Sequence, residues 1–331
     1  MPEKIEDKIN NLLALLSEYG MFSGCVLVAN KGHLIYNGAF GYANREIQKR
    51  TTSDSVFYIA SVSKQLTAMS IMLLEHAGVL SFSDALSDFL PEFHTYAEKV
   101  TIEHLLTHTS GIPDHYVSGI YKPDLTNGHV VEFLLRQNKI DFEPGECFRY
   151  SNGGYVLLAL IAEQVSGQKF HSLLKSQIFE PLGMSKTVVF DESKPAIRDR
   201  AIGYNADGAL NDYEILTTGE GGVFSTVGDL FKWDRALHSE ILIPTHKLKR
   251  AFSPHTLNHG KKSNYGYGWA LKEYQNESLV SHGGRMSGYR SYIERNIHSE
   301  NTIIILNNSS SFMTLEDLPA AIRRMLQNHS G

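Results

Sequence analysis

Residues 60–78 have the sequence ASVSKQLTAMSIMLLEHAG, which is apolar around most of a helical circumference. A helix of this kind is usually buried in the middle of a domain. The pattern predicts a helix from about Ala60 to His76, and Gly78 predicts its C-terminal end. Lys64 stands out in this segment, because burying a cation is costly unless the residue has a function. We therefore expect a central helix that carries part of a functional site.

Strand patterns flank this helix at a distance in the sequence. Residues 23–30 and 33–40 are apolar, β-rich runs separated by Lys31-Gly32, which predicts a hairpin with a tight turn. Strand patterns return only near the end of the chain, at residues 278–283, 288–296 and 301–307. Strands at both ends predict one sheet that is built from both termini.

The segment between the two strand regions is mostly helical. The predicted helices are 101–107, 129–137, 154–166 and 168–178, punctuated by prolines, and a last helix is predicted at 315–328. Helices placed between strands of one sheet predict an α+β fold with a helical lobe inserted into the sheet domain.

Composition and charge are those of an ordinary soluble globular protein. Of 331 residues, 42% are hydrophobic and 20% are charged, and the net charge is −5. No basic block predicts nucleic acid or an anionic membrane as a partner, and no apolar run is long enough to span a bilayer. The amphipathic first 20 residues lack the features of a secretory signal. We expect a cytoplasmic protein as the chain stands, or a periplasmic or extracellular one if a signal was removed.

Ser61 and Lys64 form a Ser-x-x-Lys pair at the start of the apolar helix. Residues i and i+3 share a helical face, so Lys64 can reach the Ser61 hydroxyl. Burial lowers the pKa of a lysine, and the neutral amine can then activate a serine nucleophile. A bare Ser-x-x-Lys pair also occurs by chance on ordinary helices. The apolar surroundings of Lys64 favour the catalytic interpretation.

Tyr150, Ser151 and Asn152 form a second candidate group. A tyrosine beside a cationic lysine can ionise more easily and can carry a proton to a leaving group. The Asn152 amide is suited to contact a substrate carbonyl and Lys64. The structural alternative is a loop in which Asn152 caps the helix predicted at 154–166, and the two roles are compatible.

His282, Gly283, Gly284 and Arg285 form a third candidate group within a strand pattern. Two glycines inside a strand mark either a bulge or the close approach of a ligand to the backbone. Close approach is typical of an oxyanion hole, in which a main-chain N–H faces the substrate carbonyl. Taken alone, the segment favours an edge-strand bulge with a surface histidine.

Together, the three groups resemble the serine β-lactamase and penicillin-binding protein superfamily. More narrowly, they resemble the branch of class C β-lactamases, DD-carboxypeptidases, D-aminopeptidases and related family VIII-type esterases. That branch uses Ser-x-x-Lys, Tyr-x-Asn and a Lys/His-[Thr/Gly]-Gly strand motif, in this order. Supporting segments are LLTHTSGIPD (105–114), PGECFRYSN (144–152), GGVFSTVGDLFKW (221–233) and YGYGW (265–269). The resemblance spans about residues 20–310.

The resemblance implies a β-lactamase/transpeptidase-like fold, in which an antiparallel sheet is flanked by helices. The expected domains are 1–80 plus 205–331 for the α/β sheet domain and 81–204 for the inserted helical domain, with the active site in the cleft. It also implies a nucleophile at Ser61, a base system of Lys64 and Tyr150, and a substrate-orienting role for Asn152. The implied remaining substrate-binding residues are His282, Gly283, Gly284 and Arg285, with the main-chain N–H groups of Ser61 and Arg285 as the oxyanion hole.

One departure from the pattern bears on the substrate. Class C β-lactamases have Lys-Thr-Gly where this chain has His282-Gly283-Gly284. A lysine attracts the carboxylate of a β-lactam, whereas a histidine with a pKa of about 6.5 is mostly neutral near pH 7. Poor β-lactam hydrolysis is therefore expected. If His282 contacts a substrate carboxylate, binding should improve as the pH falls from about 8 to 6.

The expected function is that of a serine hydrolase with an acyl-enzyme on Ser61, acting on small amides or esters such as D-residue peptides or esters. A true class C-like β-lactamase and a non-catalytic penicillin-recognising protein stay open as alternatives. The expected partner is a small molecule or short peptide, and β-lactam binding is a further expectation. No cofactor or metal is expected, since His104 and His108 lack a His-Glu-x-x-His pattern. Cys25 is expected to be a small buried hydrophobe.

Overall fold

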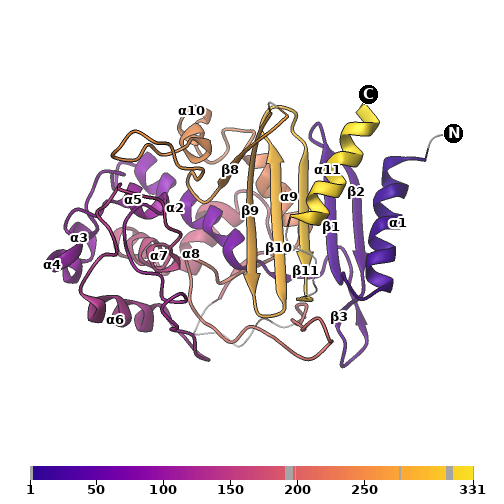
Figure 1. Cartoon of the computed structure of the whole chain (residues 1–331), viewed down its shortest axis with the longest axis horizontal. Helices are drawn as coiled ribbons and strands as arrows, with labels where there is room; N and C mark the ends of the chain where they lie inside the picture. Colours follow the sequence, from indigo (N-terminus) through magenta and orange to yellow (C-terminus); the bar gives the residue numbers. More distant parts are fainter. Residues whose placement is uncertain (1–2, 191–196, 198, 276, 311–315, 331) are drawn as a thin grey trace.

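The structure is a computed structural model, and it describes residues 3–190, 197, 199–275, 277–310 and 316–330. Within these residues, the main sheet has six antiparallel strands in the order β2-β1-β11-β10-β9-β8. Its strands are β1 Gly24–Asn30, β2 His33–Phe40, β8 Ala270–Tyr274, β9 Glu277–Met286, β10 Tyr289–Asn296 and β11 Thr302–Asn307. β1 pairs with β11, so the prediction of one sheet built from both termini is confirmed (Figure 1).

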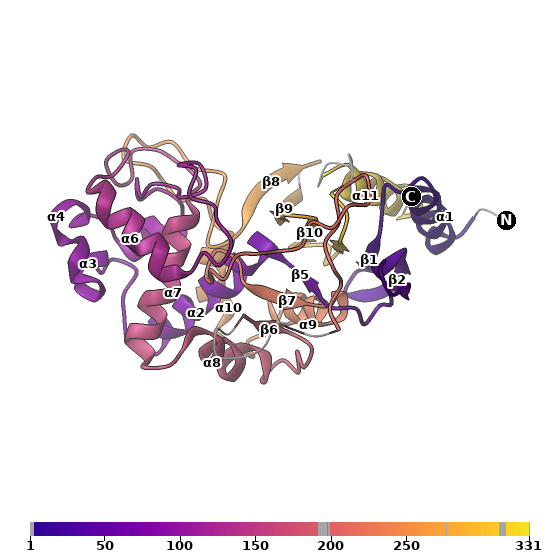
Figure 2. The same cartoon turned by 90° about the horizontal axis from the view of Figure 1, so that it is seen from below.

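The helices form a lobe beside the sheet and two layers against it (Figures 1 and 2). They are α1 Ile5–Glu18, α2 Lys64–His76, α3 Leu86–Phe89, α4 His94–Ala97, α5 Ile102–Leu106, α6 Asn127–Gln137, α7 Asn152–Ser166, α8 Phe170–Leu174, α9 Val227–Ala236, α10 Thr245–Leu248 and α11 Asp317–Ser330. Helices α3 to α8 make up the lobe. α8 is shorter than predicted because the chain continues as a π-helical turn at Lys175–Phe179. The predicted first residue of the last helix, 315, lies outside the described residues.

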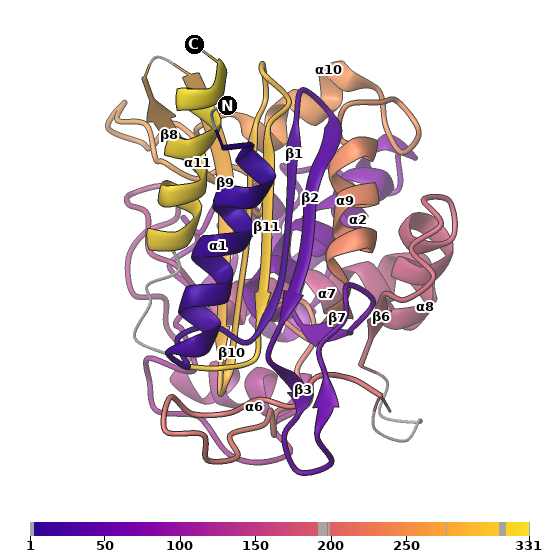
Figure 3. The same cartoon turned by 90° about the vertical axis from the view of Figure 1, so that its right-hand side faces the viewer.

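The central strands bury both faces, because alternate side chains point to opposite sides of a sheet. Val26 and Val28 of β1 pack with α1 and α11 in one core. Cys25 and Leu27 of the same strand point into the main core, on the side covered by α9. Figure 3 shows α1 and α11 side by side on their face of the sheet. The expectation of a buried Cys25 is confirmed.

The central helix begins later than the sequence predicts. Residues Ala60–Ser63 form a 3₁₀ turn, η1, and α2 starts at Lys64. Ala60 adopts a left-handed conformation with φ 45°, which is unfavourable for a residue with a Cβ atom. The turn therefore departs from the α-helix at the point where Ser61 lies.

Short strands hold η1 in place. β5 Phe57–Tyr58 pairs with β7 Val223–Ser225, and β7 also pairs with β6 Val188–Val189. A second short pair is formed by β3 Tyr42–Asn44 and β4 Lys49–Arg50. These strands were not predicted, because runs of two or three residues carry no readable periodicity.

The sheet part and the helical lobe meet along α2, which contacts α7 of the lobe, while η1 contacts β9. We keep the division into 1–80 plus 205–331 and 81–204 as a proposal. One local pairing crosses that boundary, because β6 lies before residue 204 and β7 after it. Across the described part of the chain, no helix combines the length and hydrophobicity needed to cross a membrane.

Candidate active site

Ser61 lies on η1, where three neighbouring elements fix the backbone. The N–H of Ile59 donates to the carbonyl of Val223 at 3.0 Å, and the Ser291 hydroxyl donates to the carbonyl of Ile59 at 2.6 Å. A Cβ atom added at Gly284 would lie within 3.0 Å of the Ile59 carbonyl oxygen. Gly284 is therefore needed so that β9 can approach η1.

The glycine pair in β9 does not form a bulge. The β9–β10 register runs continuously from Leu279 opposite Asn296 to Met286 opposite Tyr289. The expectation of an edge-strand bulge is wrong, since β8 rather than β9 is the edge strand and the pairing of β9 with β10 is unbroken at the glycines. At Gly284, β9 lies close to the backbone of the segment that precedes Ser61.

Lys64 is fully buried, with an exposed fraction of 0%, beside Ser61. Its Nζ lies 3.1 Å from Ser61 Oγ, 2.8 Å from Asn152 Oδ1 and 2.8 Å from the Glu220 carbonyl oxygen. Burial lowers the pKa of Lys64 to about 7, although the charges of Glu220 and Asp114 act in the opposite direction. A large share of the amine is therefore neutral near pH 7 and able to accept a proton.

Tyr150 completes the contacts of the Ser61 hydroxyl. The neighbouring Ser61 side chain lowers the pKa of the Tyr150 phenol, against the larger effect of burial, and Lys64 Nζ lies 4.9 Å from the centre of the tyrosine ring. Burial raises the pKa of Tyr150, so the phenol stays protonated at neutral pH. The expectation that Tyr150 ionises more easily is wrong, because the buried surroundings disfavour phenolate.

Asn152 is the first residue of α7, and Ser151 caps that helix. The Gly154 N–H donates to Ser151 Oγ at 3.2 Å, so the expectation that Asn152 is the cap is wrong. The Asn152 main-chain N–H and Nδ2 both donate to Asp114 Oδ2, at 2.7 Å and 2.8 Å. These contacts orient the amide so that its oxygen faces Lys64. Asp114 lies in one of the segments that support the family resemblance, but no role was predicted for it.

His108 supports the same loop from behind. Its ring centre lies 4.2 Å from that of Tyr150, and its Nδ1 accepts the Ser151 N–H at 3.1 Å. Burial lowers the pKa of His108 well below its usual value, so the ring is neutral at neutral pH. These contacts give His108 a supporting position rather than one at the reacting hydroxyl.

His282 is buried behind Tyr150, so the expectation of a surface histidine is wrong. Its Nδ1 lies 2.8 Å from the carbonyl oxygen of Gly283 and its Nε2 lies 2.8 Å from the Tyr265 hydroxyl. Since the carbonyl can only accept, Nδ1 carries the proton and Nε2 accepts from Tyr265. Burial and the charge of Lys64 lower the pKa of His282 to about 3. The ring is neutral, and both nitrogens are occupied by protein groups.

Ser61, Asn152 and Arg285 line one pocket with a volume of about 70 Å³. Its other lining residues are Tyr58, Ala60, Tyr116, Glu220, Gly221 and Met286. Sequence reasoning missed Tyr58, Tyr116 and Glu220, which reach the pocket from short or loop segments. Of the predicted residues, Lys64 and Tyr150 lie beneath Ser61, whereas His282 lies away from the pocket lining.

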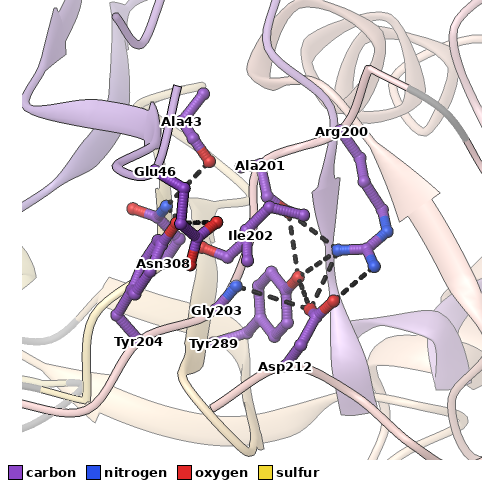
Figure 4. Close-up of polar contacts among 10 residues, drawn as sticks. All are labelled: Ala43, Glu46, Arg200, Ala201, Ile202, Gly203, Tyr204, Asp212, Tyr289 and Asn308. Atoms are coloured by element: carbon purple, nitrogen blue, oxygen red, sulfur yellow. Dashed lines mark hydrogen bonds and ion pairs between the residues drawn. The ribbon is translucent and has the colours of Figure 1, made fainter. Parts of the chain in front are cut away.

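Tyr289, which packs against the pocket residue Tyr58, belongs to a polar network with Arg200 and Asp212 (Figure 4). Arg200 Nη1 donates to Tyr289 Oη at 2.7 Å and to Asp212 Oδ1 at 2.9 Å, and the Tyr289 hydroxyl also donates to Asp212. The ring of Tyr289 packs edge-on against Tyr58, with ring centres 5.8 Å apart. The loop that carries Arg200 and Asp212 is thereby tied to β10 and to one wall of the pocket.

Comparison with known proteins agrees with this fold. The family model described as Beta-lactamase matches residues 5–325. Penicillin-binding protein 4* of Bacillus subtilis is 36% identical over 330 residues, covering 93% of this chain and 73% of the relative. The D-aminopeptidase of Brucella anthropi is 27% identical, covering 81% of this chain but 52% of that protein.

A solved structure has the same fold. The D-amino acid amidase of Ochrobactrum anthropi SV3, in complex with L-phenylalanine amide, superposes with a TM-score of 0.82 at 25% identity, covering 99% of this chain and 100% of that one. The chain belongs to the Beta-lactamase family. It is a β-lactamase-related serine hydrolase, as the sequence predicted.

Proposed function

We propose that the chain hydrolyses small amides and esters through an acyl-enzyme on Ser61. The observation that carries this proposal is the contact between the buried amine of Lys64 and Ser61 Oγ, at 3.1 Å. A serine hydroxyl becomes a useful nucleophile only when a neighbouring base takes its proton. Lys64 meets that requirement, since burial lowers its pKa to about 7.

In the acylation step, Ser61 Oγ attacks the substrate carbonyl carbon while its proton passes to the neutral amine of Lys64. The bond to the leaving amine or alcohol then breaks, and the leaving group takes a proton that the Tyr150 hydroxyl relays. In the second step a water molecule attacks the acyl carbon and gives its proton to the same base system; the bond from the acyl carbon to Ser61 Oγ then breaks, Oγ takes that proton, and the acid is released. The main-chain N–H groups of Ser61 and Arg285 are the proposed donors to the oxyanion in both steps.

The neutral environment of His282 bears on the choice of substrate. Its pKa of about 3 leaves no positive charge where a class C enzyme has a lysine. We therefore propose that β-lactams bind and acylate Ser61 but are released slowly. D-residue peptides, amides and esters are the proposed substrates, and the printed names of the D-aminopeptidase and the D-amino acid amidase support this choice.

The test compares kcat/KM for a penicillin with that for a short-chain p-nitrophenyl ester and for a D-alanine amide. We expect the ester and the amide to be turned over faster than the penicillin. A β-lactam value above about 10⁶ M⁻¹s⁻¹, within the range of efficient enzymes, would make the chain a true β-lactamase. Absence of turnover on all three, with penicillin bound non-covalently, would make it a penicillin-recognising protein without catalysis.

A further inference from the structure

Glu220 lines the pocket that holds Ser61 and has a buried side chain. The exposed fraction of the residue is 3%, and Asn152 lines the same pocket. Its main-chain carbonyl accepts from Lys64, as described above. The side chain is therefore the part of Glu220 that the proposed acylation step does not use.

The two carboxylate oxygens of Glu220 differ in their contacts. Oε1 accepts from the Thr217 hydroxyl and from the Tyr116 hydroxyl, the latter at 3.3 Å. Oε2 is buried and has no hydrogen-bond partner among the described residues. A carboxylate can accept at both oxygens, and a buried oxygen without a donor is costly. Oε1 is thus held by two protein hydroxyls, whereas Oε2 has no donor among the described residues and can accept one from a bound ligand.

The charged groups around the pocket do not supply that donor. In the portion of the chain that the structure describes, no ion pair involves Glu220. The Lys64 amine is held by Ser61, Asn152 and a carbonyl oxygen. Asp114, the second acid near Lys64, already accepts from both N–H groups of Asn152. Arg285 is exposed at the pocket lining.

From these contacts we propose that Glu220 Oε2 binds the protonated amine of the substrate's acyl group. This inference rests on the proposed acyl-enzyme at Ser61 and makes Glu220 a specificity residue rather than a member of the proton-transfer system. The substrate class is then amides and esters of amino acids whose α-amine is free. The pocket of about 70 Å³ reaches from Ser61 to Glu220, so one small aminoacyl group can span both residues.

The test uses two substrates that differ only in the amine: the p-nitroanilides of D-alanine and of propionic acid. The variant is Glu220→Gln, which keeps the shape of the side chain and removes its charge. We expect the ratio of kcat/KM for the alanine substrate to that for the propionyl substrate to fall about 10- to 100-fold, the range of a hydrogen bond to a charged group. The matched control is Glu273→Gln, at an exposed position of β8, which should leave that ratio unchanged.

The unmodified enzyme gives a second test that needs no variant. KM for the alanine substrate should rise as the pH passes above the pKa of its amine, near 8, whereas KM for the propionyl substrate should not follow that titration. An unchanged ratio in Glu220→Gln, or an equal loss on both substrates, would overturn the assignment; the equal loss would mean that Glu220 acts through Lys64. A mass adduct on Ser61 with the propionyl substrate separates these outcomes from failure of the acyl-enzyme proposal itself.

Discussion

The Nζ atom of Lys64, the first residue of the buried helix α2, lies 3.1 Å from the hydroxyl oxygen of Ser61 on η1. Two features beside this contact, the burial of Lys64 and the backbone conformation of Ala60, each cost free energy. A lysine without exposed surface loses its hydration, which lowers its pKa to about 7. Next to it, Ala60 adopts a left-handed backbone conformation directly before the serine. Both costs are typical of a site that is held ready for a reaction.

Removing either partner of Ser61 should slow catalysis strongly. We expect Lys64→Ala and Tyr150→Phe each to lower kcat by about 10²- to 10⁴-fold, the usual range for a general acid–base group. The losses should be far from additive in the double variant, because groups that act as a unit share one contribution to the barrier. Steady-state kinetics on an ester and an amide provide the measurement. Full activity of Tyr150→Phe on both substrates would reduce Tyr150 to a packing residue.

The lowered pKa of Lys64 also predicts how stability depends on pH. Between pH 7 and 10.5 the unfolded chain binds a proton at this lysine more often than the folded chain does. Stability should therefore rise with pH in this window, by at most roughly 1.4 kcal/mol per pH unit from this group. Urea unfolding of the parent and of Lys64→Met at several pH values isolates the effect. The unfolding free energy of the parent minus that of Lys64→Met should rise with pH at up to this slope. A difference that does not change with pH would show that Lys64 has an ordinary pKa.

The sequence predicted those features of the site that depend on local spacing. Ser61 and Lys64 are three residues apart, so their contact follows from helical geometry, and the sheet built from both termini follows from strand patterns. The surroundings of His282 could not be predicted in this way. Its neutral state depends on burial and on the charge of Lys64, and its tautomer depends on the Gly283 carbonyl and on the hydroxyl of Tyr265, 17 residues earlier in the sequence.

The roles of Glu220 and Asp114 were not predicted either, because they too depend on contacts between residues that are distant in the sequence. Each gains its position from partners far away in the sequence: Asp114 from Asn152 and Glu220 from Tyr116, which is 104 residues away. Burial and partners of a carboxylate are properties of the folded chain, and neither residue type nor periodicity predicts them. The sequence motifs therefore predicted the residues that carry the reacting atoms, but they did not predict the residues that shape the pocket.

The buried, neutral His282 predicts a flat pH response in substrate binding. Because its pKa is about 3, no histidine titration should affect KM for a carboxylate-bearing substrate between about pH 6 and 8. This reverses the expectation drawn from the ordinary pKa of histidine. KM for a D-Ala-D-Ala peptide, measured across this range against an ester without a carboxylate, provides the test. A KM that falls toward pH 6 for the peptide alone would show that His282 becomes protonated and binds the carboxylate.

Gly284 should tolerate no side chain. We expect Gly284→Ala to displace η1, because its Cβ would lie within 3.0 Å of the Ile59 carbonyl oxygen. Overpacking of this kind costs about 1–3 kcal/mol of stability and should also lower kcat by moving Ser61. Gly228→Ala in α9 is the matched control, since a Cβ there meets only ordinary contact distances. Equal activity of the two variants would show that β9 does not hold the nucleophile segment in place.

The acyl-enzyme on Ser61 is tested most directly by intact-mass analysis followed by peptide mapping after brief exposure to a penicillin and to a p-nitrophenyl ester. We predict one acyl group per chain, located on Ser61, with a longer lifetime for the penicillin adduct than for the ester adduct. Ser61→Ala should show no adduct and no turnover. Ser63 is the nearest rival, and its hydroxyl is fully buried. Cys147 is a free thiol of intermediate burial and is a second rival. An adduct on Ser63 or Cys147, or labelling that persists in Ser61→Ala, would contradict the account.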